Sequence, residues 1–140
     1  MVDVGDKQAT DRRALARAVV RMSTDTAAAV ARGDAPKGDV VSTARIAGIQ
    51  AAKQTSQLIP LCHNLNLSHV EIEIATSGAG LEVKCVARTI AQTGVEMEAL
   101  TGVAIALLTI YDMCKAVDKE MQIADIHLLK KTKREAGELE

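Results

Sequence analysis

The chain has 140 residues, a length typical of one folded domain, and residues 1–140 are expected to form a single domain. Seventeen basic and eighteen acidic residues give a net charge of -1, and Tyr111 is the only aromatic residue, so the core must be aliphatic. Such a chain has neither the positive field nor the stacking rings with which proteins bind nucleic acids or anionic membranes, so neither partner is expected.

The N-terminal part predicts an arm followed by a strand. Residues 1–12 become polar after a short apolar start and are expected to form an N-terminal arm. Residues 13–22 are ambiguous, because Ala and Leu favour a helix whereas an adjacent pair of valines favours a strand. Of these two interpretations we favour the strand.

Two helices are predicted next, on either side of a loop. The first spans residues 24–32, with Ser23 as its N-cap and a glycine directly after it. Residues 34–38 contain a proline and a glycine and form a loop that carries Lys37. The second helix spans residues 39–57, where small apolar residues recur at helical spacing.

A β-hairpin follows a short connector over residues 59–64, in which a proline ends the second helix. Residues 65–75 and 81–89 each alternate between apolar and polar side chains, and a turn with two glycines separates them. The alternation skips one position at Ser68–His69, which indicates a β-bulge.

A long helix and a last strand complete the domain. Residues 98–119 are largely apolar and free of proline, so they predict a buried helix. Residues 121–129 alternate again, and residues 130–140 are expected to be a charged tail. Together these elements predict an α+β domain of ferredoxin-like type, with an antiparallel sheet and helices packed on one face.

The cysteines indicate the compartment. Cys62, Cys85 and Cys114 are widely spaced and contain no CxxC pair, which argues against a disulfide framework and against a zinc site. We therefore expect no metal and a reducing, cytoplasmic setting. The longest nearly apolar run, residues 99–111, is too short to span a bilayer, so no membrane association is expected.

Polar residues that could carry chemistry form four groups: Lys37–Asp39, Cys62–His63, Glu96–Glu98, and Tyr111–Asp112 with Lys115. Asp112 and Lys115 share one face of the predicted helix, where a carboxylate can orient an ammonium for acid–base work. The alternative is a solvated ion pair. The apolar residues around the pair would desolvate it unless it lines a cavity.

The other groups each allow a functional and a structural interpretation. Lys37 could reach an anionic ligand or could be solvated on its loop. His63 could act in acid–base chemistry or satisfy local backbone, and Cys62 could simply pack. Glu96 and Glu98 could favour the positive end of the helix or could bind guanine-like N–H donors.

Spacing along the long helix indicates a shared site. Fourteen residues separate Glu98 from Asp112, about 21 Å along a straight helix. The two carboxylates could hardly serve one small substrate from the same chain, so a site formed between subunits is expected. In the tail, Lys130, Lys131, Lys133 and Arg134 could hold phosphates or could be solvated.

Two long segments resemble the MoaC family: KGDVVSTARIAGIQAAKQTSQLIPLCHNL from residue 37 and TGVEMEALTGVAIALLTIYDMCKAVDKEM from residue 93. The resemblance covers almost the whole chain. It implies a ferredoxin-like α+β subunit, a homo-oligomer that is a hexamer built as a trimer of dimers, and active sites between two subunits. It also implies a small-molecule substrate, 3′,8-cyclo-7,8-dihydroguanosine 5′-triphosphate, which is converted to cyclic pyranopterin monophosphate with release of pyrophosphate and without a cofactor.

The resemblance also implies roles for individual residues. Catalytic roles fall on Lys37 of the KGD motif and on Asp112 and Lys115 of the YDMCK motif. Substrate-binding roles fall on residues that match other motifs or flank them, namely Arg12, Cys62, His63, Glu96, Met97, Glu98 and Lys131.

Two departures from the family pattern stand near these residues. Asn64 follows His63 where the family usually has proline. Lys133, Arg134 and Glu135 stand where the family usually has a Gly-Gly-Lys turn, so the conformation of the chain after Lys131 is expected to differ.

Two other hypotheses about function are kept. One is a non-catalytic ferredoxin-like module that binds a small ligand. The other is a Cys/His metal protein, which the spacings of the cysteines and histidines hardly support.

Overall fold

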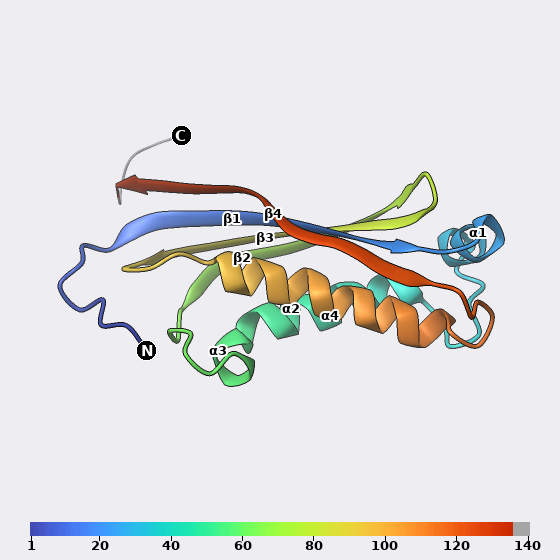
Figure 1. Ribbon diagram of the computed structural model, residues 1–140, viewed down its shortest axis with the longest axis horizontal. Helices are drawn as coiled ribbons and strands as arrows, with labels where there is room; N and C mark the ends of the chain where they lie inside the picture. Colours follow the sequence, from blue (N-terminus) through green and yellow to red (C-terminus); the bar gives the residue numbers. More distant parts are fainter. Residues whose placement is uncertain (136–140) are drawn as a thin grey trace.

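The computed structural model describes residues 1–135, which fold into a four-stranded sheet and four helices (Figure 1). In chain order the elements are β1 (Thr10–Arg21), α1 (Thr24–Arg32), α2 (Val40–Lys53), α3 (Thr55–Leu58), β2 (Leu67–Ser77), β3 (Gly80–Ala91), α4 (Glu96–Cys114) and β4 (Gln122–Glu135).

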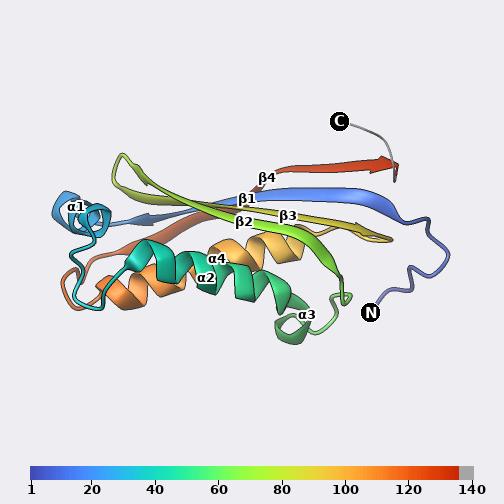
Figure 2. The same cartoon turned by 180° about the vertical axis from the view of Figure 1, so that it is seen from behind.

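The sheet has the strand order β2-β3-β1-β4, and every neighbouring pair is antiparallel. Strand β3 therefore lies between β1 and β2, as in a split βαβ unit. Helices α2 and α4 lie side by side on one face of this sheet, and α1 lies at one end (Figures 1 and 2). The predicted ferredoxin-like α+β arrangement with helices on one face is confirmed.

Small side chains on the sheet allow the two long helices to pack closely. The residues of β1 that face the helices are mostly alanines, among them Ala14, Ala16 and Ala18, and all three are buried. On α4, a Cβ added to Gly102 would lie 2.7 Å from the sulfur of Cys85 on β3. The core is thus aliphatic, as its composition requires, and it depends on close backbone approach as well as on bulk.

Both ends of the sheet extend further than the sequence pattern predicted. The early strand is confirmed, but it begins at Thr10, so the predicted arm over residues 1–12 is too long. The last strand continues to Glu135, so residues 130–135 belong to the sheet and not to a tail. Charged residues carry no apolar alternation, and only pairing with β1 reveals this part of the strand. Residues 136–140 of the predicted tail lie outside the described residues.

The bounds of both predicted long helices differ from those observed. The helix over residues 39–57 is divided into α2 and α3, where the hydroxyl of Thr55 donates to the carbonyls of Ala51 and Ala52 at 3.0 and 2.9 Å. The helix over residues 98–119 starts at Glu96 and ends at Cys114. Beyond it, the carboxylate of Asp118 accepts hydrogen bonds from backbone N–H groups outside the helix, which favours a turn.

Other local predictions are confirmed. Ser23 caps α1 by accepting a hydrogen bond from the backbone N–H of Thr26, and Gly33 ends this helix at a left-handed φ of 76°. The hairpin is formed by β2 and β3, and its register shifts between Leu67 and His69, where the bulge was predicted. Helix α4 is long and apolar enough to cross a membrane, but half of it is buried against the sheet and α2, as in the core helix of a globular protein.

Candidate active site

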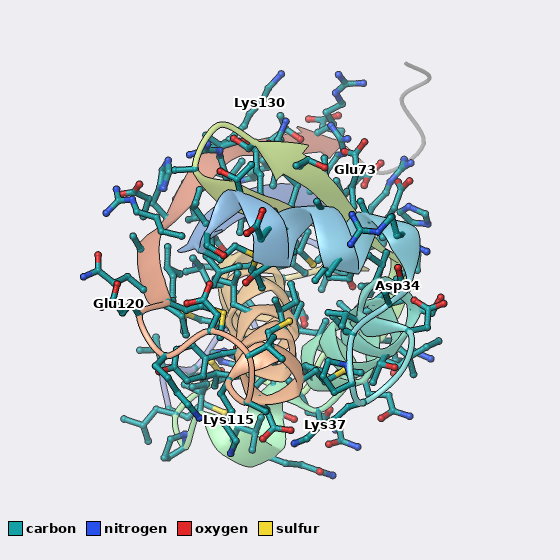
Figure 3. All side chains as sticks on the ribbon, turned by 90° about the vertical axis from the view of Figure 1, so that its right-hand side faces the viewer. Asp34, Lys37, Glu73, Lys115, Glu120 and Lys130 are labelled. Carbon is teal, nitrogen blue, oxygen red and sulfur yellow. The ribbon has the colours of Figure 1, made fainter. Side chains whose placement is uncertain are left out.

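Lys37, Asp112 and Lys115 meet at the C-terminal end of α4. The Lys37 ammonium lies 3.2 Å from Oδ2 of Asp112, and the Lys115 ammonium lies 3.1 Å from Oδ1 of the same carboxylate. All three side chains are about half exposed, and Figure 3 shows both lysines at the same end of the molecule. The structure therefore brings together the three residues that sequence analysis named as catalytic.

Local structure explains how these side chains reach one another. Lys37 lies on the loop between α1 and α2, next to Gly38, whose φ of 108° is a conformation that suits glycine. Asp112 is in the last turn of α4, and Lys115 is the C-cap residue, whose helical dihedral angles keep it on the same face as Asp112. The loop thus adds a second amine from a distant part of the sequence.

Hydrogen bonds from both lysines keep the carboxylate of this group charged. The bond from Lys115 and then that from Lys37 hold the pKa of Asp112 below its ordinary value. Because the group is open to solvent, this pairing adds little to folding stability. Its consequence is geometric, since one carboxylate holds two amines close together.

A second set of the predicted site residues lies at the other end of α4. Arg12, Glu96 and Lys131 line a cavity of about 260 Å³ between the N-terminus of α4 and the ends of β1 and β4. The Lys131 ammonium is 3.3 Å from Oε1 of Glu96. The guanidinium of Arg12 donates to the hydroxyl of Thr10 and, at 3.5 Å, to the carbonyl of Gln92. This cavity offers cations and a helix N-terminus to an anionic ligand.

Glu98 is the most unusual carboxyl of this second set. Its residue is only 5% exposed, and its Oε2 atom has no hydrogen-bond partner among the described residues. Burial, with a smaller contribution from the charge of Glu96, raises the pKa of Glu98 to about 7. Burial and, to a smaller extent, the charge of Glu98 also raise the pKa of the neighbouring Cys62 thiol. A buried carboxyl without a partner is expected where a ligand supplies the missing hydrogen bond.

The remaining predicted residues are held in other ways. Nε2 of His63 lies 2.6 Å from the carbonyl oxygen of Val2, so the N-terminal arm engages the imidazole. Met97 is more than one third exposed, in the first turn of α4. Asn64, which departs from the family pattern, lies 3.4 Å from the hydroxyl of Ser56. None of these contacts brings His63 or Met97 to the lysines at the far end of α4.

The two sets are too far apart to act together within one chain. Glu96 and Asp112 lie sixteen residues apart on one continuous helix, which corresponds to about 24 Å. The sequence-based distance argument therefore holds for the folded chain. Each end of α4 carries some of the residues that sequence analysis assigned to one active site.

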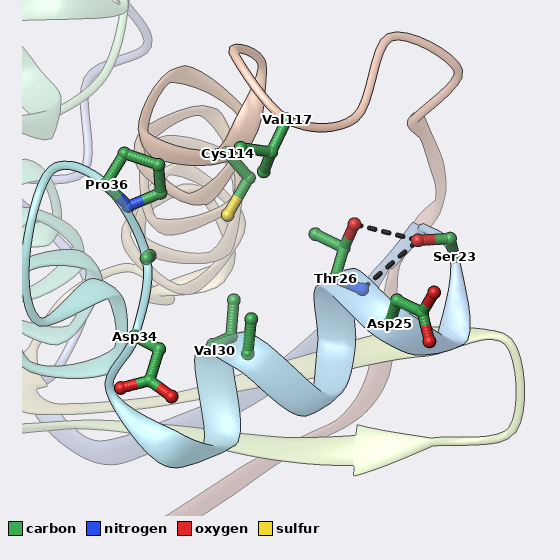
Figure 4. Close-up of a pocket in the computed structure, with 10 residues that line it drawn as sticks. Ser23, Asp25, Thr26, Val30, Asp34, Pro36, Cys114 and Val117 are labelled. Atoms are coloured by element: carbon green, nitrogen blue, oxygen red, sulfur yellow. Dashed lines mark hydrogen bonds between the residues drawn. The ribbon is translucent and has the colours of Figure 1, made fainter.

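Another cavity lies beside the lysine group but has different chemistry. It has a volume of about 310 Å³ and lies between α1, the loop after it and the end of α4 (Figure 4). Its lining includes Val30, Pro36 and Cys114, and among residues 1–135 its charged lining residues are Asp25 and Asp34, both acidic. Such a cavity is not suited to a polyphosphate. Within residues 1–135, no group of three or more His, Cys, Asp or Glu side chains is placed to hold a metal ion.

Sequence analysis left the role of Lys133 open between holding phosphates and solvation in a tail. Lys133 lies directly opposite Arg12 across the β1–β4 pair and lines the same cavity as Arg12. The alternation of Lys131 and Lys133 on one side of a strand is the signal that could have indicated this. This end of β4 lacks the apolar residues from which strands are usually predicted.

Comparison with known proteins identifies the family. Residues 1–134 match the MoaC family. A protein of Chloroflexus aurantiacus named cyclic pyranopterin monophosphate synthase is 56% identical over 140 residues, covering 99% of this chain and 86% of the relative. Relatives with the same name from Roseiflexus sp. (strain RS-1) and Peptoclostridium acidaminophilum are 54% and 51% identical and cover 99% and 100% of this chain, which spans 89% of each relative. The chain therefore belongs to the MoaC family.

Proposed function

We propose that this chain is a cyclic pyranopterin monophosphate synthase of molybdenum cofactor biosynthesis. It converts 3′,8-cyclo-7,8-dihydroguanosine 5′-triphosphate to cyclic pyranopterin monophosphate and releases pyrophosphate. Relatives that are more than half identical over nearly the whole chain carry this name. The observation that carries the proposal is the bridging of Asp112 by Lys37 and Lys115 at 3.2 and 3.1 Å.

The reaction needs proton transfers that two adjacent amines can supply. It opens the five-membered ring of the purine, closes a pyran ring, and forms a cyclic phosphate by attack on the α-phosphorus. A lysine can give or accept a proton at each step, and a charged ammonium can stabilise the departing pyrophosphate. Asp112 acts as the positioning carboxylate, because it is hydrogen-bonded to both amines.

Substrate binding is assigned to the second set of residues. Glu98 is buried and has an acceptor atom without a partner in the described part of the chain, as binding to the N–H groups of a guanine-derived ring requires. Glu96, Met97, Cys62 and His63 are assigned to the same ring pocket. Arg12 and Lys131 provide the cations for the triphosphate.

A complete site then needs two subunits. The lysine group of one subunit faces the Glu98 and Arg12 set of a neighbour, which overcomes the distance of about 24 Å along α4. A homo-oligomer, a hexamer built as a trimer of dimers, is the assembly proposed. A cytoplasmic location is supported by the three free cysteines, since unpaired thiols are typical of a reducing compartment.

Turnover is the direct test. The purified protein, mixed with the cyclised nucleotide, should release pyrophosphate and form cyclic pyranopterin monophosphate, both of which can be measured by chromatography and mass spectrometry. A Lys37→Ala variant serves as the matched inactive control. Binding of the nucleotide without pyrophosphate release would contradict the proposed activity and favour a non-catalytic binding module.

A shared site can be tested by complementation. Lys37→Ala and Glu98→Gln variants, each inactive alone, are co-expressed with different affinity tags so that mixed assemblies can be isolated. In a mixed dimer one site carries both changes and the other carries neither, so half of its sites are intact. When subunits pair at random within the hexamers, about half of the dimers are mixed, and about a quarter of the wild-type activity is restored. No recovery in mixed assemblies would contradict a site formed by two subunits.

A further inference from the structure

Lys37 lies on a loop that close packing alone does not fix. Residues 34–36, just before the lysine, line the cavity of about 310 Å³ between α1 and the end of α4 (Figure 4). Just after the lysine, a Cβ added to Gly38 would meet nothing within 4 Å. Dense packing restricts a residue to one position, but here a cavity borders one side of the loop and open space borders the glycine. The contact between Lys37 and Asp112 therefore depends on the backbone of the loop.

Hydrogen bonds fix that backbone at two points. The N–H of Gly38 donates to the carbonyl of Ala35 at 3.0 Å, which closes a β-turn with Lys37 at one of its two central positions. Gly38 then adopts a φ of 108°, and Asp39 directly after it is the N-cap of α2. The lysine is thus two residues away from the residue that begins a helix.

Asp39 ties the loop to α2 through its side chain and its main chain. Its Oδ1 accepts a hydrogen bond from the backbone N–H of Ser42 at 3.0 Å, and its Oδ2 accepts one from the Ser42 hydroxyl at 2.8 Å. Its carbonyl oxygen accepts from the N–H and the hydroxyl of Thr43 at 3.2 and 2.6 Å. Helix α2 is itself held by the core, because Val40 and Ala44 in its first two turns are at most 1% exposed. Asp39 therefore joins the loop to a helix that the core holds in place.

The same bonds make Asp39 unsuited to proton transfer. The hydrogen bond from the backbone N–H of Ser42 and then that from its hydroxyl hold the pKa of Asp39 below its ordinary value, so the carboxyl stays charged near neutral pH. Among residues 1–135, Lys37 forms its ion pair with Asp112 and none with Asp39. Asp39 can act on the lysine through the backbone that joins them.

We propose that Asp39 is a positioning residue of the reaction, which holds Lys37 against Asp112 by capping α2. The inference rests on the proposed function, in which Lys37 acts on the substrate. A lysine side chain is a flexible stem, so its ammonium stays in one place only if its backbone is fixed. Without the cap, the first turn of α2 frays and Gly38 regains its conformational freedom. Catalysis is sensitive to such a change, because a displacement of a reacting group by about 1 Å can cost about a hundredfold in rate.

The first experiment measures the contact itself and does not depend on turnover. A water-soluble carbodiimide activates the carboxylate of Asp112, and a neighbouring amine then forms an amide, with the lost water taken up as a urea. The amines of Lys37 and Lys115 lie at 3.2 and 3.1 Å and compete for this carboxylate, so the ratio of their two amides reports the position of Lys37. Peptide mass spectrometry of the treated full-length protein measures the ratio. In Asp39→Ala it should fall about fivefold, the factor by which an N-cap typically favours its helix end.

Two further variants separate positioning from stability. Asparagine caps a helix about as well as aspartate does, so Asp39→Asn should restore the amide ratio that Asp39→Ala loses. The matched control is Ser23→Ala, which removes the corresponding cap of α1, where Ser23 accepts from the N–H of Thr26 at 3.1 Å. This control should lower the urea midpoint and leave the amide ratio unchanged.

The second experiment measures kcat and KM for the cyclised nucleotide. Lys37 is assigned to the chemical steps, whereas substrate binding is assigned to the Glu98 and Arg12 set. Asp39→Ala should therefore lower kcat at least about tenfold and change KM by less than about twofold. Asp39→Asn should restore kcat, and Ser23→Ala should keep both constants. A role in stability alone would lower the urea midpoint of Asp39→Ala without this separation of kcat from KM.

The inference is overturned by an unchanged amide ratio in Asp39→Ala, by an equal fall of the ratio in Ser23→Ala, or by wild-type kcat in Asp39→Ala. A loss that Asp39→Asn does not reverse also overturns it, because the effect then belongs to the charge of Asp39 and not to the cap. The proposed function fails separately. If the wild type does not convert the cyclised nucleotide, the synthase activity is wrong, and the amide ratio still decides whether Asp39 holds Lys37 in place.

Discussion

Replacement of Glu98 with glutamine should stabilise the protein above neutral pH and abolish its activity. The folded protein raises the pKa of this buried carboxyl from 4.5 to about 7. Between these two values the folded state binds the proton more tightly than the unfolded state does. The stability that Glu98 contributes is therefore fully present below pH 4.5 and is lost as the pH rises through about 7.

The expected magnitude follows from the size of this pKa change. One pKa unit corresponds to about 1.4 kcal/mol, so the wild type should lose roughly 3 kcal/mol of unfolding free energy from Glu98 over this pH range. Glutamine has nearly the same shape and does not ionise. Glu98→Gln should therefore resemble the wild type in stability at pH 4 and exceed it by roughly 3 kcal/mol at pH 8.

Urea denaturation of both proteins at pH 4 and pH 8 measures this difference. Carboxyls that are stabilised in the folded state, such as Asp11 and Glu82, contribute the opposite dependence, but they are present in both proteins and cancel in the comparison. Glu73→Gln, at an exposed position on β2, controls for the loss of one negative charge. An equal difference between wild type and Glu98→Gln at both pH values would refute the argument from burial.

Three further predictions concern the lysines, the helix packing and the thiols. Lys37→Ala and Lys115→Ala should keep the wild-type circular dichroism spectrum but lose product formation. The control variant Lys53→Ala, at the exposed end of α2, should still form product. Wild-type turnover in both Lys37→Ala and Lys115→Ala would refute their catalytic assignment. Gly102→Ala should destabilise the protein by roughly 1 kcal/mol. Crowding of the new methyl group against the sulfur of Cys85 at 2.7 Å costs about 1–3 kcal/mol, whereas the higher helix propensity of alanine returns about 1 kcal/mol. A urea midpoint at or above that of the wild type would contradict this prediction. Mass spectrometry after brief alkylation of the native protein should find label on Cys62 and none on the two buried cysteines until urea is added.

Much of the fold follows from local patterns in the sequence. The hairpin, its bulge at Ser68–His69, the caps of α1 and the apolar run of α4 are each encoded by neighbouring residues, and each is confirmed. The same is true of the pairing between Asp112 and Lys115, because a helix always brings residues three positions apart to one face. Membership of the MoaC family was also evident from the motifs.

Other features depend on contacts between distant segments, and only the tertiary structure decides them. Lys37 reaches Asp112 because the loop before α2 folds against the end of α4. Lys133 lies in a strand and faces Arg12 because β4 pairs with β1, which no pattern of charged residues within β4 alone encodes. The burial of Glu98 and its raised pKa likewise result from packing by other elements. Local sequence determines which backbone conformation is favoured, whereas the environment of a charge depends on which distant residues exclude water from it.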